Sequence, residues 1–131
     1  MQEQPENLDS YKDQYTEKKL WRKIARFAQR MGIKTVYTTL LMFFAYKRKE
    51  TPRWAKSIVV GALGYLISPI DLLPDLTPII GYTDDLGVLG FGLVTIAAFI
   101  NEDVKKSARA QLAKWFPNYN EKDLVEVEDR I

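Results

Sequence analysis

The spacing of hydrophobic residues predicts a chain built from helices. In residues 17–31, apolar side chains recur at every third or fourth position, and Lys and Arg occupy the other side. The next helix is more apolar, and Gly32 separates the two. Helices are expected at residues 17–31, 33–46, 51–67, 83–100 and 102–116. No segment alternates apolar and polar residues as a strand does, so the predicted fold class is all-α.

Proline and hydroxyl residues mark where the central helices begin. Thr51-Pro52 places an N-cap residue before a proline at the first helical position. Ser68-Pro69-Ile70-Asp71 has the spacing of a capping box, and with Pro74 and Pro78 it predicts short helical turns instead of one long helix. These breaks divide the chain into five parts. They are a mobile polar segment (1–16), a basic amphipathic region (17–50), a helical hairpin (51–101), an amphipathic helix (102–116) and an acidic tail (117–131).

Charge is strongly segregated along the chain. The sequence has 19 basic and 17 acidic residues. In the stretch from Lys18 to Lys56, however, every charged residue except Glu50 is basic. Between Ser57 and Asn101 there is no basic residue at all. The chain also has no Cys and no His, which excludes disulfides, thiolate chemistry, zinc sites and histidine acid–base catalysis.

Both arms of the predicted hairpin, residues 57–67 and 86–100, are apolar on every side, as in a core helix or a bilayer segment. The longer arm would extend roughly 22 Å, against a bilayer hydrocarbon core of roughly 30 Å. Transmembrane arms, a re-entrant hairpin and a soluble cytoplasmic bundle all stay open. We expect membrane association, because few residues remain to cover the hairpin. Close helix contact, with a protein partner or by self-association, is expected through the glycines Gly61, Gly64, Gly87 and Gly90.

The first helix has the composition of a segment that lies on an anionic lipid membrane. It combines aromatic residues on one face with cations on the other. The positive-inside rule then puts the basic N-terminal half on the cytoplasmic side of the inner membrane. No secretory signal is expected, because residues 1–16 are polar and mostly acidic. The residues expected at the membrane surface are Lys18, Lys19, Trp21, Arg22, Lys23, Arg26, Phe27 and Arg30.

Four aspartates, Asp71, Asp75, Asp84 and Asp85, interrupt the apolar hairpin. Helix capping explains these residue types without a ligand. The alternative is a carboxylate site for Mg²⁺, Mn²⁺ or Ca²⁺ that supports metal-dependent chemistry or ion binding. No carboxylate motif, Gly-rich phosphate loop or nucleophile elbow accompanies the aspartates. The sequence therefore leaves enzymatic activity open and favours a non-enzymatic role.

Residues 65–85 form a long motif that reads Y-L-x-x-P-x-D-L-x-P-D-x-x-P-x-x-G-x-x-D-D. This motif closely resembles the hallmark of the YkvA-like family of bacterial domains of unknown function, the "1232" domain family. The resemblance covers about residues 53–100 and implies a helical module, often predicted to lie in membranes, with no assigned reaction. It supports the hairpin and leaves the biochemistry open.

Three functions compete. A membrane-associated anchor or scaffold accounts for both the apolar hairpin and the basic region before it. A divalent-metal site at the aspartates is the main alternative. Nucleic-acid binding by the basic half, with Trp21 and Phe27 among its cations, is the third. That function lacks a recognised motif and leaves the apolar hairpin unexplained.

Overall fold

The computed structural model describes residues 17–26, 28, 31–72 and 87–131, and the side chains of these residues except 67–72. Within these ranges the regular structure is helical and contains no strand, so the predicted all-α fold is confirmed. Residues 17–26 form a helical segment. The elements that follow are α2 (Ile33–Lys47), α3 (Arg53–Leu72), α5 (Gly87–Thr95), the 3₁₀ helix η1 (Ala97–Phe99), α6 (Glu102–Trp115) and α7 (Glu121–Glu128).

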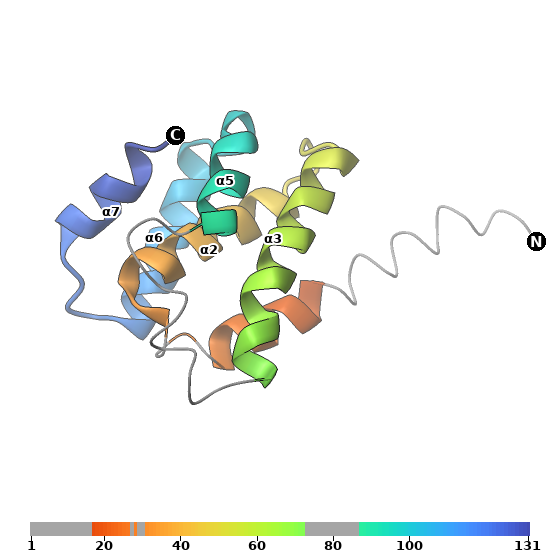
Figure 1. Cartoon of the computed structure of the whole chain (residues 1–131). Coiled ribbons are helices and arrows are strands. Elements are labelled where there is room, and N and C mark those ends of the chain that lie inside the picture. The colour runs from red at the N-terminus through yellow and green to blue at the C-terminus, as the bar shows by residue number, and fades with distance from the viewer. Residues whose placement is uncertain (1–16, 27, 29–30, 73–86) are drawn as a thin grey trace, which may run out of the picture.

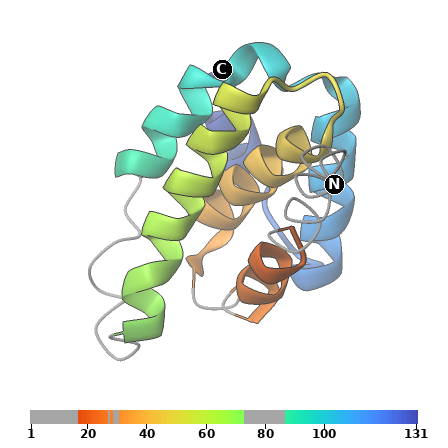
Figure 2. The same cartoon turned by 90° about the vertical axis from the view of Figure 1, so that its right-hand side faces the viewer.

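Helix α2 is the centre of the molecule. Every residue from Thr35 to Phe43 is buried, as expected for a helix that is apolar all round. In both Figure 1 and Figure 2, α6 lies on one side of α2 and the pair α3 and α5 lies on the other. Segment 17–26 adds Leu20 and Ile24 to the same core. The hairpin arms were expected to be core or bilayer segments, whereas the most completely buried helix in the described ranges is α2.

Local hydrogen bonds explain how α2 ends and how the chain turns into α3. Gly32 precedes α2 with φ of 76°, a backbone conformation that glycine adopts readily. At the other end, the Thr51 hydroxyl donates to the Ala45 carbonyl at 2.6 Å, and the Arg48 guanidinium donates to the Phe99 carbonyl at 2.8 Å. The turn is therefore tied both to α2 and to η1.

Helix α3 is longer than the sequence pattern predicts. It continues through Pro69 to Leu72, so the predicted break at Ser68 is wrong. Proline disrupts a helix by removing one hydrogen bond and by crowding the carbonyl four residues earlier. In α3 both effects fall on the turn just before Pro69, and the helix continues only three residues beyond it, to Leu72.

Helix α5 is shorter than predicted. It ends at Thr95 instead of Ile100, and η1 follows. The Phe99 and Ile100 amides donate to the carbonyls of Ile96 and Ala97 at 2.9 and 3.1 Å, which are the tighter bonds of a 3₁₀ turn. The predicted N-cap of this helix at Thr83 lies outside the described residues.

The C-terminal part contains one expected and one unexpected helix. In α6, the Asn101 side chain accepts a hydrogen bond from the Val104 amide at 2.9 Å, and the helix ends before Pro117 as predicted. The acidic segment 117–131 contains α7, which the sequence analysis did not predict. Leu124 and Val127 of α7 are buried against the core. With only two inward apolar positions, this helix has too weak a pattern to detect from sequence.

Candidate functional site

Large hydrophobic side chains are exposed on α3 and α5. The exposed fractions are Trp54 53%, Tyr65 63%, Val88 45%, Phe91 73% and Val94 53%. We call these five residues the α3–α5 apolar face. In the rest of the described chain, only Val125 and Ile131 are large hydrophobic residues that are similarly exposed. Clustered exposed apolar residues are a mark of binding surfaces in otherwise water-exposed proteins.

The helical period divides α5 into a core side and an exposed side. Val88, Phe91 and Val94 recur every three residues, so they lie along one side of the helix. Leu89 and Leu93 lie on the other side and are buried. The exposed residues of α5 therefore form a stripe.

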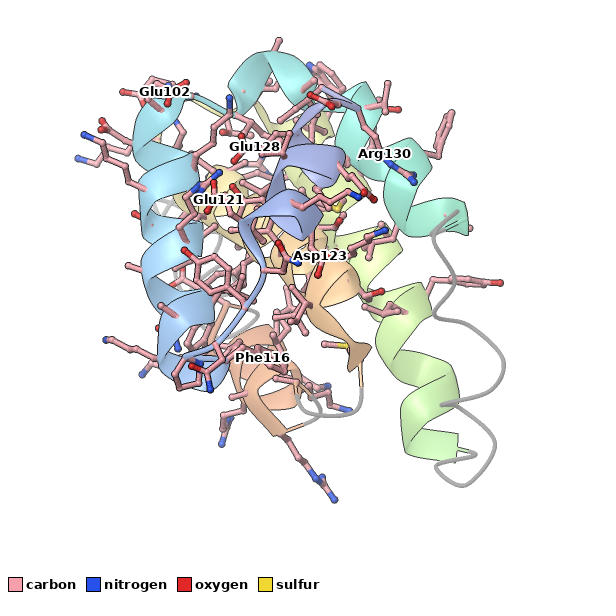
Figure 3. The ribbon with its side chains drawn as sticks, turned by 90° about the vertical axis from the view of Figure 1, so that its left-hand side faces the viewer. Glu102, Phe116, Glu121, Asp123, Glu128 and Arg130 are labelled. Atoms are coloured by element: carbon pink, nitrogen blue, oxygen red, sulfur yellow. The ribbon has the colours of Figure 1, made fainter. Side chains whose placement is uncertain are left out.

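Helix α3 is divided in the same way. Trp54 and Tyr65 are eleven residues apart, which is three helical turns, so they lie on the same side and about 16 Å apart along the axis. Ala55, Val59 and Leu63 are fully buried on the opposite side. Helices α3 and α5 lie side by side and form one edge of the molecule in Figure 2 and Figure 3. The two stripes thus belong to adjacent helices.

The Trp54 end of the apolar face is bordered by cations. The Trp54 ring packs edge-on against the Phe99 ring, with 5.7 Å between centroids. Lys49 and Arg53 are exposed nearby in the sequence, and the Lys56 ammonium lies 5.7 Å from the centre of the Tyr46 ring. A hollow of about 630 Å³ at this end is lined by Tyr46, Thr51, Arg53, Lys56, Ser57, Val60 and Gly61. An apolar surface with basic residues at one end suits an anionic, amphiphilic partner.

One known family matches a segment that includes most of α3 and the first part of α5. Residues 55–91 match the model of a family described as "Protein of unknown function (DUF1232)". The chain carries a DUF1232 domain. This match confirms the family resemblance of the motif at residues 65–85. Searches of curated proteins and of solved structures found no match.

The DUF1232 domain supplies most of the apolar face. Tyr65, Val88 and Phe91 lie inside the matched range, and Trp54 and Val94 lie just outside its two ends. The same domain supplies core residues that pack on α2, such as Val59 and Leu63. The described helical parts of the DUF1232 segment therefore have one side in the core and one side exposed.

The four aspartates of the DUF1232 domain cannot be placed as a cluster. Asp71 belongs to the last turn of α3, where only the backbone is described. Asp75, Asp84 and Asp85 lie outside the described residues. Among the residues that the structure describes, no three acidic side chains come together in a way that could hold a metal ion. The divalent-cation site stays a prediction.

The glycines of α3 and α5 divide into two groups. Gly61 and Gly64 are exposed, and a Cβ atom at either would meet nothing within 4 Å. Gly87 has φ of 50° and also faces open space, and Gly90 is buried. The close approach between α3, α5 and α2 occurs at Gly92, where a Cβ atom would lie 2.8 Å from the Met42 methyl group. Self-association through Gly61, Gly64, Gly87 and Gly90 stays a prediction.

The described helices do not meet the requirements of a membrane span. No helix in the described ranges combines the length and the apolar character needed to cross a bilayer. The transmembrane version of the hairpin prediction is therefore unsupported by these helices.

The basic segment 17–26 turns its cations outward and its apolar side inward. Lys18, Lys19, Arg22 and Arg26 are exposed, and Lys23 and Trp21 are half-buried. Leu20 and Ile24 are buried in the core. We expected the apolar side of this helix to rest in the membrane, but here it faces protein. Two of the residues predicted at the membrane surface, Phe27 and Arg30, lie outside the described residues.

Sequence reasoning missed a polar cluster between α2, α6 and α7. The Glu128 carboxylate accepts hydrogen bonds from the Tyr37 hydroxyl at 2.5 Å and from the Arg109 guanidinium at 2.8 Å. Arg109 also donates to Glu121 at 2.6 Å, and Figure 3 shows Glu121 and Glu128 on the side of α7 that faces α6. Tyr37 and Glu128 are 91 residues apart, so no local sequence pattern could reveal this contact.

The cluster shifts the ionisation of its members. Burial opposes ionisation of Glu128, but the hydrogen bonds from Tyr37 and Arg109 and the charge of Arg109 outweigh it, and the pKa of Glu128 is lowered. Burial and the hydrogen bond to Glu128 raise the pKa of Tyr37. All three groups therefore hold their usual charge states near neutral pH. The cluster joins helices and has no acid or base poised for catalysis.

Proposed function

We propose that this protein binds the surface of anionic membranes peripherally, as a non-enzymatic anchor or scaffold. In this proposal the α3–α5 apolar face enters the interface between lipid headgroups and acyl chains. The single observation that supports it is the exposure of five large hydrophobic residues on two adjacent helices. Covering such residues with lipid lowers the free energy by about 25 cal/mol per Å² of apolar surface buried.

Basic residues give the proposed surface its preference for anionic lipid. Arg53 and Lys56 line the hollow beside Trp54, where a lipid phosphate would be attracted. Each cation near an anionic surface contributes about 1 kcal/mol. Because cytoplasmic leaflets are anionic, we place the protein on the cytoplasmic side of the inner membrane. Segment 17–26 and its outward cations would then contribute at longer range.

Flotation with vesicles tests this proposal. The full-length protein is mixed with vesicles of neutral phosphatidylcholine, or with vesicles that also contain anionic phosphatidylglycerol, and floated through a density gradient. The Phe91→Glu variant removes an exposed ring from the face, and we expect its partition into anionic vesicles to fall at least tenfold, since burying a Phe side chain contributes about 1.5–3 kcal/mol. Val125→Glu is the matched control, because Val125 is an exposed apolar residue on α7.

Three results would contradict the proposal. The wild-type protein could fail to float with either kind of vesicle. Phe91→Glu could float as well as Val125→Glu does. Sedimentation equilibrium could show a stable dimer that Phe91→Glu dissociates, in which case a second copy of the chain, and not lipid, covers the face.

A further inference from the structure

A second hollow lies away from the α3–α5 apolar face. It has a volume of about 590 Å³ and opens between segment 17–26, the C-terminal part of α2 and α6. Figure 2 looks onto the side of the molecule that carries segment 17–26. The volume is within the range of about 300–1,000 Å³ that is usual for pockets that bind small molecules. None of its lining residues belongs to the apolar face.

Aromatic rings form the floor of this pocket. The centroid of the Trp21 ring lies 5.1 Å from that of Phe43 and 5.4 Å from that of Trp115. The centroids of Phe43 and Phe44 are 5.5 Å apart, and these two rings pack edge to face. These distances are those of packed aromatic pairs. Since the rings hold one another in place, the floor is a preformed apolar surface.

Cations form the rim. Lys18, Arg22 and Lys47 line the pocket together with one acid, Glu17. The Lys47 ammonium lies 5.8 and 5.9 Å from the centres of the Phe43 and Phe44 rings, so a positive charge stands directly over the floor. An aromatic pocket can also bind a cationic ligand, but this rim would repel one. Charge complementarity selects an anion.

We propose that this pocket binds a free single-chain anionic amphiphile. Its alkyl chain would lie against Trp21 and Phe44, and its carboxylate or phosphate head would be bound by Arg22 and Lys47. The pocket volume suits one chain. This ligand class follows from the floor and the rim alone and does not depend on membrane binding by the α3–α5 apolar face.

Calorimetric titration of the full-length protein tests the pocket. The probes are dodecanoate, dodecyl phosphate and dodecyltrimethylammonium, each kept below its critical micelle concentration. We expect saturable binding of dodecanoate, dodecyl phosphate or both, and at least tenfold weaker binding of the cationic probe. The two anionic probes distinguish a carboxylate from a phosphate head.

Three variants locate the binding. Replacing two of the three rim cations, Arg22→Gln with Lys47→Gln, is expected to weaken anion binding about tenfold, since each exposed charge contributes up to about fivefold. Phe44→Ala removes part of the floor and is expected to weaken binding of every alkyl probe. Lys19→Gln is the matched control, because Lys19 is exposed on the same helical segment and does not line the pocket. Thermal unfolding checks that each variant is folded.

Four outcomes would overturn the proposal. The first is that neither anionic probe binds saturably. The second is that the cationic probe binds as tightly as the anionic probes. The third is that Lys19→Gln weakens anion binding as much as the double variant does. The fourth comes from flotation. If Phe44→Ala lost vesicle binding as fully as Phe91→Glu does, the pocket would take lipid from a bilayer instead of a free amphiphile. Loss of vesicle binding in Phe91→Glu alone would leave the pocket proposal intact, so the failures of the two proposals are distinguishable.

Discussion

Glu128 shows how one residue can join three helices. Its carboxylate, 19% exposed, accepts hydrogen bonds from Tyr37 of α2 and from two nitrogens of Arg109 of α6. Hydrogen bonds that involve a charged group contribute more than neutral ones, about 1.5–3 kcal/mol each. Glu126 on the same helix forms an ion pair with Lys34 but is 44% exposed, and exposed ion pairs contribute little.

Glu128→Gln is therefore expected to lower the free energy of unfolding by about 1–3 kcal/mol at pH 7, and Glu126→Gln by less than about 1 kcal/mol. The folded pKa of Glu128 lies below its ordinary value of 4.5. Its contribution is therefore fully present above about pH 4.5 and is lost as the pH falls through the folded pKa. Urea unfolding followed by circular dichroism at several pH values measures this. Equal stability of Glu128→Gln and wild type at pH 7 would contradict the assignment.

Two glycines of neighbouring helices, Gly92 and Gly61, differ in whether the packing requires them. A Cβ atom at Gly92 would lie 3.3 Å from the Ala62 Cβ as well as 2.8 Å from the Met42 methyl group, whereas Gly61 faces open space. Only the first glycine is required for packing. The sequence shows the two as equivalent small residues in apolar helices.

Gly92→Ala is expected to destabilise the protein by about 1–3 kcal/mol, because overpacking outweighs the helix propensity that alanine adds. Gly61→Ala is expected to stabilise it by up to about 1 kcal/mol, since the added methyl group meets nothing. Thermal unfolding of both variants measures the difference. A Gly61→Ala variant less stable than Gly92→Ala would mean that the close helix contact lies elsewhere.

At the scale of elements, α7 depends on the rest of the fold. An isolated helix of eight residues is unstable in water, and α7 is held by Leu124 and Val127 in the core and by the Glu128 cluster. Helices α3 and α5 both have apolar residues on two sides. Only one of these sides is covered by the described chain in each helix.

Leu124→Ala is expected to destabilise the protein by about 2–5 kcal/mol, because it removes a fully buried side chain. Val125→Ala on the neighbouring, exposed position is the control, and its effect should stay within about 0.5 kcal/mol. Hydrogen exchange should show faster exchange of the α7 amides than of the α2 amides in Leu124→Ala. Equal protection of the two helices would contradict the dependence of α7 on this contact.

At the scale of the whole molecule, two candidate surfaces lie around the central helix α2. The α3–α5 apolar face belongs to the edge formed by α3 and α5, and the aromatic pocket belongs to segment 17–26, α2 and α6. Because these surfaces share no residues, variants such as Phe91→Glu and Phe44→Ala can test them independently. Both surfaces take their cations from the basic stretch Lys18–Lys56.

The sequence by itself determined the helical class, most helix positions and the DUF1232 motif, because these depend on residues close together in the chain. Local signals such as Asn101, Pro117 and Gly32 mark real helix ends. The same local signals failed at Pro69, where a helix end tolerates proline.

Only the tertiary structure decided which apolar surfaces are buried. Helices α2, α3 and α5 and segment 17–26 all have apolar faces, and a small core cannot cover them all. Burial of Ile24 and exposure of Phe91 are outcomes of that competition, which depends on contacts between residues far apart in sequence. The same holds for Tyr37 and Glu128, since a pattern along the chain carries no information about which distant groups meet.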